Sequence, residues 1–535
     1  MNESLQTTFE LLRETRNEAA LGVLIPALES PHPAIREAAL TTILRRRSPA
    51  AHREVLRRLH TLDEGAKGIV REKRSRMTQT IRDALLGDDQ QLFVNGCHAA
   101  VWLGEYDVVP ALINVLEDRT NPNSELASKT VLELTDLLYG QLANPDGGGR
   151  GCDPRFVRHH MVGSLELSVE RYSSHQRREL VEAFVLLVGR DNVRLKRILE
   201  NPHHDAFPVL VDVLSKSPTA GAIGLLLSLM DHPHAPSAVL SVVAGRRDLK
   251  FVQYLLRKIG REPSTAMRQN LERITSVPWL QDGAALMDQL DDAAQHAVVR
   301  LVTTTAIARE QAFATVEHLL RHGKPGGRRS AAEALSEFTG AEANALALEA
   351  MDDEDPQVQA NALRQFRSRG IPGALQRLVE MVDSRHAVVR KAARESLDEF
   401  SFSRFLAAFD MLDDEVRRST GTLVKKIDPQ TVPLLRAEME SRVRTRRLRA
   451  LVIARTIDLV ARLEEEIIKL LHDDDHLVRA EAAAALGLNE STGSRDALHA
   501  ALEDGSATVQ EAAKKSLQQQ DQASQRQEAF SAPLD

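Results

Sequence analysis

An apolar pattern with a period of about 31 residues recurs along much of this 535-residue chain. It is clearest in Leu470 to Gly487, LLHDDDHLVRAEAAAALG, where one amphipathic run ends, an acidic turn follows and a second run begins. Four small or aliphatic residues recur at helical spacing in the second run: Val478, Ala482, Ala485 and Leu486. Asp473 to Asp475 precede this run, where carboxylates accept the unpaired amide hydrogens of a helix N-terminus. The stretch predicts two helices joined by a tight turn.

The register of Val478 reappears along the second half of the chain. The equivalent positions are Val299, Gly327, Val358, Val389, Val416, Val443 and Val509, and several bring an arginine after them: Arg300, Arg328, Arg390, Arg444 and Arg479. Because one helical hairpin cannot bury its apolar face alone, repeated hairpins stack and each supplies part of its neighbour's core. We therefore predict an all-α fold, an α-solenoid of stacked antiparallel hairpins, with room for roughly 17 hairpins in the whole chain.

The combination of an acidic turn, an arginine beside the apolar residue and a Gly after the last Leu resembles a HEAT repeat. It is similar to the short form that also occurs in bilin lyase-type proteins. The resemblance implies an armadillo-like helical superhelix. Steps near 30 residues are shorter than the ~40–47 residues of longer HEAT units, so we expect brief helices of about three turns.

Four segments are expected along the chain. Residues 1–118 read as HEAT-like hairpins with a basic patch, 281–517 as regular HEAT-like repeats, and 518–535 as a flexible polar tail without periodicity. In residues 119–280 the repeat is hard to follow, so either degenerate hairpins or an inserted helical domain accounts for this stretch. We favour degenerate hairpins, because no strand-like alternation appears in the sequence.

Composition excludes several classes of protein. The net charge of −7 and the pI near 6.3 argue against a general polyanion binder, so any nucleic-acid role must be local. Cys97 and Cys152 form no CxxC, so neither a disulfide framework nor a cysteine-rich zinc module is available. The N-terminus is charged where a signal peptide needs an apolar run, and the most apolar stretch, Gly221 to Gly245, is interrupted by Asp231 and two prolines. We expect a cytoplasmic protein without a membrane span.

Basic residues are concentrated in the N-terminal hairpins. Between Arg36 and Arg82 there are 13 Lys and Arg against 5 Asp and Glu, a surplus of 13 − 5 = +8. The residues that dominate it are Arg45, Arg46, Arg47, Arg57, Arg58, Lys73, Arg74 and Arg76. A second set, Arg442, Arg446 and Arg449, falls at i, i+4 and i+7, which predicts one stripe of one helix. Arginine pairs bidentately with carboxylate and phosphate, so these are candidate partner-binding residues, with solvated helix faces as the alternative.

Motifs for catalysis or metal binding are weak. The Gly-rich loop Gly147 to Gly151 lacks the Lys and hydroxyl of a P-loop and reads as a surface loop. His204 followed by Asp205 resembles the central dyad of HD-type metal phosphohydrolases, but such a site needs several ligands from different helices. No histidine is followed by Glu, which argues against the repeated His-Glu pairs of an iron-binding HEAT-like hydroxylase. We predict no catalytic residue, no metal and no cofactor.

The favoured hypothesis is a non-enzymatic scaffold or adaptor that binds one or more proteins along the concave surface of the solenoid. Stacked hairpins present a long surface whose exposed side chains can vary without disturbing the core. One alternative is a metal-dependent hydrolase or lyase-like enzyme that uses His160, His204 or Asp205 in the divergent middle. Another is nucleic-acid binding by the basic hairpins, which predicts affinity that falls steeply with salt. No small-molecule substrate is evident.

Overall fold

The computed structural model describes residues 3–144, 153–260, 263–281 and 284–531. Within these ranges the backbone forms thirty-four α-helices and ten short 3-10 helices, and no strand occurs in them. This confirms the predicted all-α class. The chain divides into two compact units, residues 1–315 and 316–535, and α21 (Arg309–His322) crosses from one to the other.

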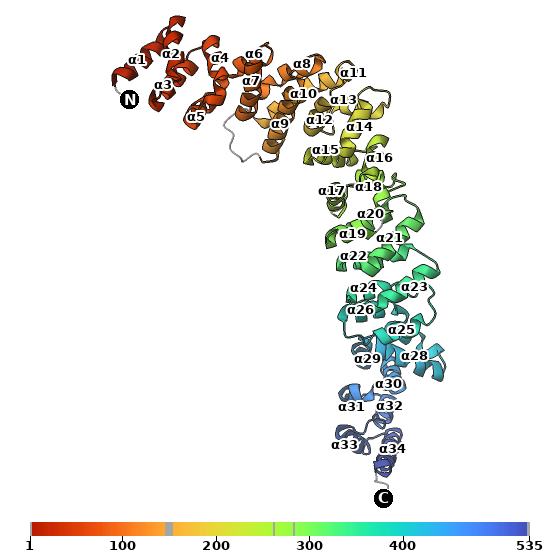
Figure 1. Ribbon diagram of the computed structural model, residues 1–535. Coiled ribbons are helices and arrows are strands. Elements are labelled where there is room, and N and C mark those ends of the chain that lie inside the picture. Colours follow the sequence, from red (N-terminus) through yellow and green to blue (C-terminus); the bar gives the residue numbers. More distant parts are fainter. Residues whose placement is uncertain (1–2, 145–152, 261–262, 282–283, 532–535) are drawn as a thin grey trace. The chain divides into compact units, whose positions relative to one another are not determined.

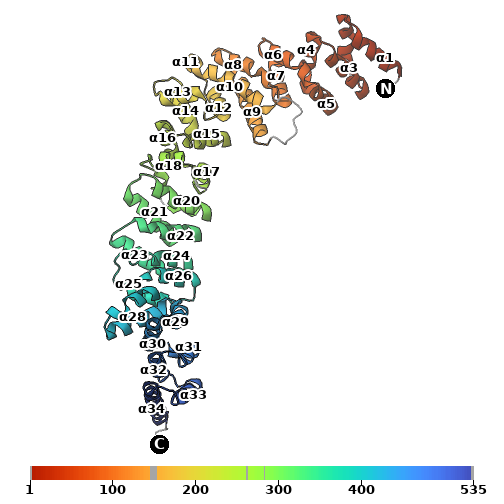
Figure 2. The same ribbon diagram turned by 180° about the vertical axis from the view of Figure 1, so that it is seen from behind.

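In unit 1 the helices alternate between two layers. Around its N-terminal hairpins, α2, α4, α6 and α8 form one layer and α3, α5, α7 and α9 the other, as Figures 1 and 2 show from opposite sides. The helices of unit 1 are α1 (Glu3–Glu14), α2 (Leu21–Ala27), α3 (Pro33–Arg45), α4 (Pro49–Arg57), α5 (Glu64–Glu72), α6 (Thr78–Leu85), α7 (Gln90–Leu103), α8 (Val109–Glu117), α9 (Ser124–Ala143), α10 (Pro154–Glu170), α11 (Tyr172–His175), α12 (Arg178–Leu187), α13 (Val193–Glu200), α14 (Phe207–Lys216), α15 (Ala220–Met230), α16 (Ser237–Gly245), α17 (Leu249–Gly260), α18 (Thr265–Leu271), α19 (Ala284–Asp288) and α20 (Asp292–Thr304).

The stretch predicted to be divergent is helical where the structure describes it. It contains α9 to α18; α9 packs against α8, and α17 packs against α20. Helix packing therefore continues on both sides of this stretch. The boundaries at residues 118 and 280 remain a prediction, and the division between the compact units lies after Thr315. Gly147 to Gly151 lies outside the described residues.

Unit 2 repeats the same construction. Its helices are α22 (Pro325–Ala334), α23 (Ala341–Glu349), α24 (Pro356–Leu363), α25 (Ala374–Met381), α26 (Ala387–Glu395), α27 (Phe402–Ala408), α28 (Asp414–Ile427), α29 (Thr431–Met439), α30 (Arg444–Thr456), α31 (Glu464–Leu470), α32 (His476–Leu486), α33 (Thr492–Ala501) and α34 (Ala507–Ser531). Asp475 caps α32 as predicted, because its carboxylate accepts the amide hydrogen of Leu477 at 2.9 Å.

The predicted core positions are buried at most repeats and exposed at two, and the register itself is wrong at one of these. Val358, Val389, Val478 and Val509 are fully buried, whereas Val416 is 39% and Val443 52% exposed. Val443 is the N-cap of α30, so the residue equivalent to Arg479 is Arg447 rather than Arg444. Val416 does occupy the equivalent position, but the first turns of α28 are largely exposed and nothing in the described chain covers it.

A ladder of polar side chains links the repeats of unit 2. The fourth residue of each helix in one series donates to a backbone carbonyl just before its own helix: Arg328, Gln359, Arg390, Arg417, Arg447, Arg479 and Gln510. Arg479 bonds the carbonyl of Asp473 at 2.8 Å and also the carboxylate of Asp504 at 2.8 Å, in the next turn. Arg447 in turn bonds the carboxylate of Asp473. The turns at Asp473 and Asp504 are thereby fixed by their own repeat and by the one before.

A second recurring contact joins neighbouring repeats through the carbonyls at a helix C-terminus or just after it. The side chains involved are Arg46, Arg246, Arg369 and Gln520, and each donates to carbonyl oxygens 29 to 34 residues earlier. Gln520 is 2% exposed and bonds the carbonyls of Leu486 and Asn489. The structure thus differs from the predicted polar tail, because α34 continues through its first residues and packs on α32.

Candidate interaction surface

The basic N-terminal hairpins contain cations that the fold already uses. Arg57 pairs with Asp89 at 2.9 Å, and Arg58 pairs with Glu29 at 3.1 Å; both also contact Glu54. These pairs join neighbouring repeats across 32 and 29 residues. Exposed pairs of this kind contribute about 0–1 kcal/mol each. Arg57 and Arg58 therefore belong to the packing of the repeats, although both were predicted to contact a partner.

Arg46 is also structural. It is 7% exposed, and its guanidinium donates to the carbonyl oxygens of Leu12 at 2.5 Å, Thr15 at 2.7 Å and Asn17 at 3.0 Å. A buried cation with three backbone acceptors is not available to a second molecule. The prediction that Arg46 binds a partner is wrong for this reason. Arg74 likewise points into the array, towards the carbonyl of Leu103 at 3.5 Å.

A different group of cations has no ion pair or hydrogen bond to the part of the chain that the structure describes. It comprises the predicted Arg45, Arg47, Lys73 and Arg76 together with Arg16 and Arg53. All except the half-buried Lys73 are exposed. Arg16 and Arg53 were not predicted as contacts: Arg16 lies outside the Arg36–Arg82 stretch whose charge was counted, and Arg53 lies within it, apart from the runs of neighbouring cations that dominate it. The signal that identifies Arg16 is structural: the carbonyls of its two neighbours, Thr15 and Asn17, bind Arg46.

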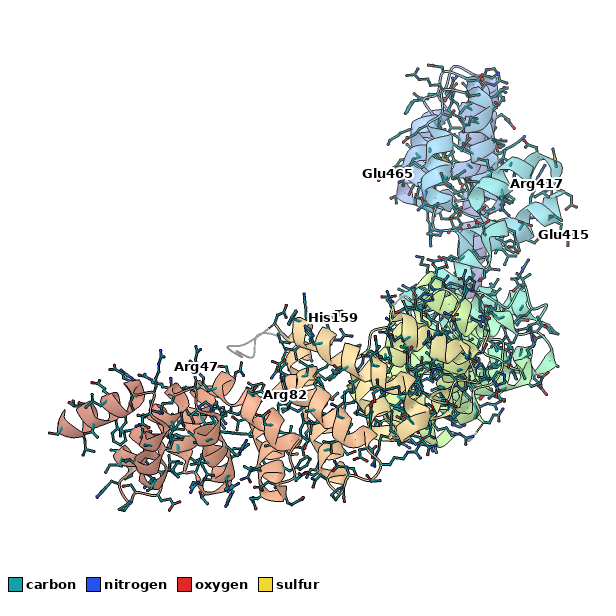
Figure 3. The ribbon with its side chains drawn as sticks, turned by 90° about the horizontal axis from the view of Figure 1, so that it is seen from above. Arg47, Arg82, His159, Glu415, Arg417 and Glu465 are labelled. Carbon is teal, nitrogen blue, oxygen red and sulfur yellow. The ribbon has the colours of Figure 1, made fainter. Side chains whose placement is uncertain are left out.

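Five of these cations lie at the ends of three neighbouring helices. Arg16 follows α1, Arg45 and Arg47 flank the end of α3, and Lys73 and Arg76 follow α5. Arg46 holds the end of α3 against the end of α1, and α3 packs between α1 and α5. We call these five residues the helix-end cations. Figure 3 shows Arg47 on the red part of the ribbon, with Arg82 further along.

The charge of Arg76, which follows α5, acts on His52, which lies against the end of α3. His52, at the start of α4, lies 3.2 Å from the carbonyl oxygen of Ile43 in the last turn of α3. Burial lowers the pKa of His52, and the positive charge of Arg76 lowers it further. Arg76 thus lies near enough to His52 for its positive charge to affect that imidazole. Helix C-termini carry partial negative charge, which keeps such a concentration of cations tolerable.

The second predicted cluster does not form one stripe. Arg442 is exposed and precedes α30, which begins at Arg444. Arg446 is bound by both oxygens of Glu438, and Arg449 lies 3.5 Å from Asp410. Only Arg442 has no side-chain partner among the described residues, so the three residues do not make a shared surface.

The residues of the enzyme alternative belong to different elements. His159 and His160 are on α10, and His204 lies in the turn after α13, where its Nδ1 accepts from the amide of Ala206 at 3.1 Å. In the described ranges, no group of three or more His, Cys, Asp or Glu is arranged to hold a metal ion.

A pocket of about 140 Å³ in unit 2 is lined by Arg394, Leu397, Asp398, Phe400, Ser401, Ile427 and Asp428, none of which was predicted as a site.

Among the described helices, none is by itself long and apolar enough to cross a membrane. α14 and α15 meet that test only as a pair, and they are bent by 108° at the break between them.

Comparisons with known proteins identify the repeat. The family profile of HEAT repeats matches residues 314–398, which confirms the resemblance and the α-solenoid fold. No curated protein matches the chain. Among solved structures, one engineered protein from the Northeast Structural Genomics Consortium is similar at 15% identity over 94% of this chain and 98% of its own, with a TM-score of 0.18. A second engineered protein from that consortium is similar at 18% identity over 51% of this chain and 96% of its own, with a TM-score of 0.18.

Proposed function

We propose that this chain is a scaffold that holds partner proteins on the exposed surfaces of its helical repeats, with the basic N-terminal hairpins as a main contact. HEAT repeats typically serve as protein-interaction scaffolds, which supports the class of function. The observation that carries the proposal is the division of the basic residues. One group is bound to backbone carbonyls or to carboxylates of neighbouring repeats. The side chains of the helix-end cations have no hydrogen bond or ion pair to the described part of the chain.

The unbound group supports binding rather than stability. A free guanidinium loses no protein contact when a partner approaches, and it gains charge-assisted hydrogen bonds to carboxylates. Removal of such a side chain also leaves no buried group unsatisfied, so its presence is not explained by folding. We also propose a cytoplasmic location, which the free, buried thiol of Cys97 supports.

Affinity purification of the full chain from its source cell, with and without nuclease, tests the proposal. One variant carries Arg45→Ser, Arg47→Ser and Arg76→Ser. A control carries Arg377→Ser, Arg462→Ser and Lys469→Ser, which removes three exposed cations of unit 2 that also have no described partner. We expect proteins recovered in near-stoichiometric amount, unaffected by nuclease, and lost from the first variant alone. Recovery of no such protein, or equal recovery by both variants, would contradict the proposal.

Nucleic-acid binding by the same hairpins is the second candidate function, and the surplus of unpaired cations is the observation that favours it. It predicts that recovered proteins disappear after nuclease treatment. It also predicts direct binding of DNA or RNA that weakens steeply as salt is raised.

A further inference from the structure

The helix-end cations form a row rather than a compact patch. Packed helices lie ~8–10 Å apart, so the ends of α1, α3 and α5 are spaced by about that distance and span roughly 20 Å. The contacts of Arg46 with the last turn of α1 fix the first interval, and the packing of α3 on α5 fixes the second. Cations therefore recur at a regular interval set by the repeat itself.

An extended peptide matches this interval. In the polyproline II conformation it rises about 3.1 Å per residue with three residues per turn, so every third side chain lies on the same face and successive ones are about 9 Å apart. Carboxylates at every third position would each meet a cation, Arg16 first, then Arg45 or Arg47, then Lys73 or Arg76. Arginine and lysine both pair with carboxylate, and the arginine fork can do so with two parallel hydrogen bonds.

Nucleic acid fits the row less well. Single strands bind on exposed aromatic side chains, whereas here Phe9 and Phe93 are buried and Trp102 lies beneath the guanidinium of Arg71, 5.3 Å from the ring centre. Duplex DNA presents one phosphate per ~1.7 Å, a much closer spacing than that of the three helix ends. Residues 1–315 as a whole are not basic, because they carry 38 Lys and Arg against 39 Asp and Glu, or 38 − 39 = −1.

We propose that the ends of α1, α3 and α5 bind an extended acidic segment of a partner protein, in the polyproline II conformation, whose Asp or Glu residues recur about every third position. This inference rests on the proposed scaffold function and names the chemistry of the partner. The free peptide segment would lie across the ends of the three helices, with the side chain of Arg46 beneath it as a fixed support.

Fluorescence anisotropy with the full chain tests this inference. The probe is a labelled Gly/Ser peptide of about ten residues with a Glu at every third position, a length that spans the row. A second peptide has the same composition with its Glu residues consecutive, and a deoxythymidine oligonucleotide carries the same net charge. We expect the spaced peptide to bind at least about tenfold more tightly than either, because only its spacing engages all three helix ends.

Variants separate this surface from general charge. Arg45→Ser with Arg47→Ser and Arg76→Ser should weaken the spaced peptide by about tenfold or more, since several exposed pairs are lost together. The unit 2 control, Arg377→Ser with Arg462→Ser and Lys469→Ser, should leave its affinity unchanged. Circular dichroism should report the same helix content in both. Equal binding of the two peptides, tighter binding of the oligonucleotide, or equal loss in both variants would each overturn the inference.

The two proposals fail differently. If the Arg45, Arg47 and Arg76 variant loses its partner proteins but no acidic peptide binds, the scaffold stands and the acidic segment is excluded. If the spaced peptide binds but no partner protein is recovered, the surface is real and the scaffold function is contradicted.

Discussion

The guanidinium of Arg46 donates a hydrogen bond of 2.5 Å to the carbonyl oxygen of Leu12, which lies 34 residues earlier in the chain. The same guanidinium also donates to the carbonyl oxygens of Thr15 and Asn17. One residue of the following repeat thus binds the carbonyls at the end of α1 and just after it. Helix ends leave carbonyl groups without intrahelical partners, and a solenoid with short helices has many of them. Side chains of the next repeat donate hydrogen bonds to these carbonyls, so the turns themselves can stay short.

Arg46→Ala should destabilise the N-terminal repeats by about 2–4 kcal/mol, because three carbonyls lose a charged donor in a buried place. Arg45→Ala and Arg47→Ala should change stability by less than about 0.5 kcal/mol, because both side chains are exposed and unbound. Hydrogen exchange of α1 and α3 is the suitable measurement, since repeat arrays need not unfold in one step. Equal protection in Arg46→Ala and Arg45→Ala would contradict the structural role of Arg46.

Asp504 should make the last repeats sensitive to acid. The hydrogen bond from Arg479 is the main cause that lowers the pKa of Asp504 below its ordinary value, and the amide of Ser506 adds to it. A lowered folded-state pKa means that this contribution is present above the unfolded pKa near 4 and is lost as pH falls through the folded value.

Hydrogen exchange of α33 and α34 measured between pH 7 and pH 3 checks this expectation. Asp504→Asn should reduce protection at pH 7 and flatten its fall towards acid. Asp496→Asn is the control, since Asp496 is exposed and has no side-chain partner among the described residues. The same pH dependence in wild type and Asp504→Asn would show that the bond with Arg479 contributes nothing.

The repeat could be predicted because its core positions recur in the sequence, and Val358, Val389, Val478 and Val509 are buried as that register requires. The prediction was wrong at Val443 because it was aligned with the buried Val478, whereas Val443 is the N-cap of α30, which begins after it. Helix boundaries depend on which carbonyls and caps are satisfied, and an apolar pattern alone does not contain that information.

The basic surface was harder to predict for a related reason. Three consecutive arginines, Arg45, Arg46 and Arg47, cannot be told apart from the sequence. The structure buries the middle one and leaves the other two exposed. Which of them meets α1 depends on where α3 ends and on how the two helices stack. The pairs of Arg57 and Arg58 could have been found, however, because Asp89 and Glu29 lie close to one repeat period away.

Two glycines of α15 should respond oppositely to alanine. A Cβ at Gly221 would lie 2.5 Å from Leu186 Cδ1 and 3.1 Å from the Leu186 carbonyl oxygen, so Gly221→Ala should destabilise unit 1 by about 1–3 kcal/mol. A Cβ at Gly224 meets nothing within 4 Å, so Gly224→Ala should stabilise the helix by about 0.5–1 kcal/mol. Thermal unfolding and hydrogen exchange of α12 and α15 compare the two. Stabilisation by both variants would mean that α15 does not approach α12 as closely as the structure has it.

Cys97 should be unreactive in the folded protein. Burial raises the pKa of its thiol to about 11, and the residue is 1% exposed within α7. Because the thiolate is the reactive form, a thiol reagent at pH 8 should leave Cys97 unmodified in a Cys152→Ser variant, whose only cysteine it is. The same variant in denaturant should react with one equivalent, which serves as the control. Rapid modification without denaturant would show that α7 opens in solution and that the packing of α7 on α6 and α9 is less stable than its burial implies.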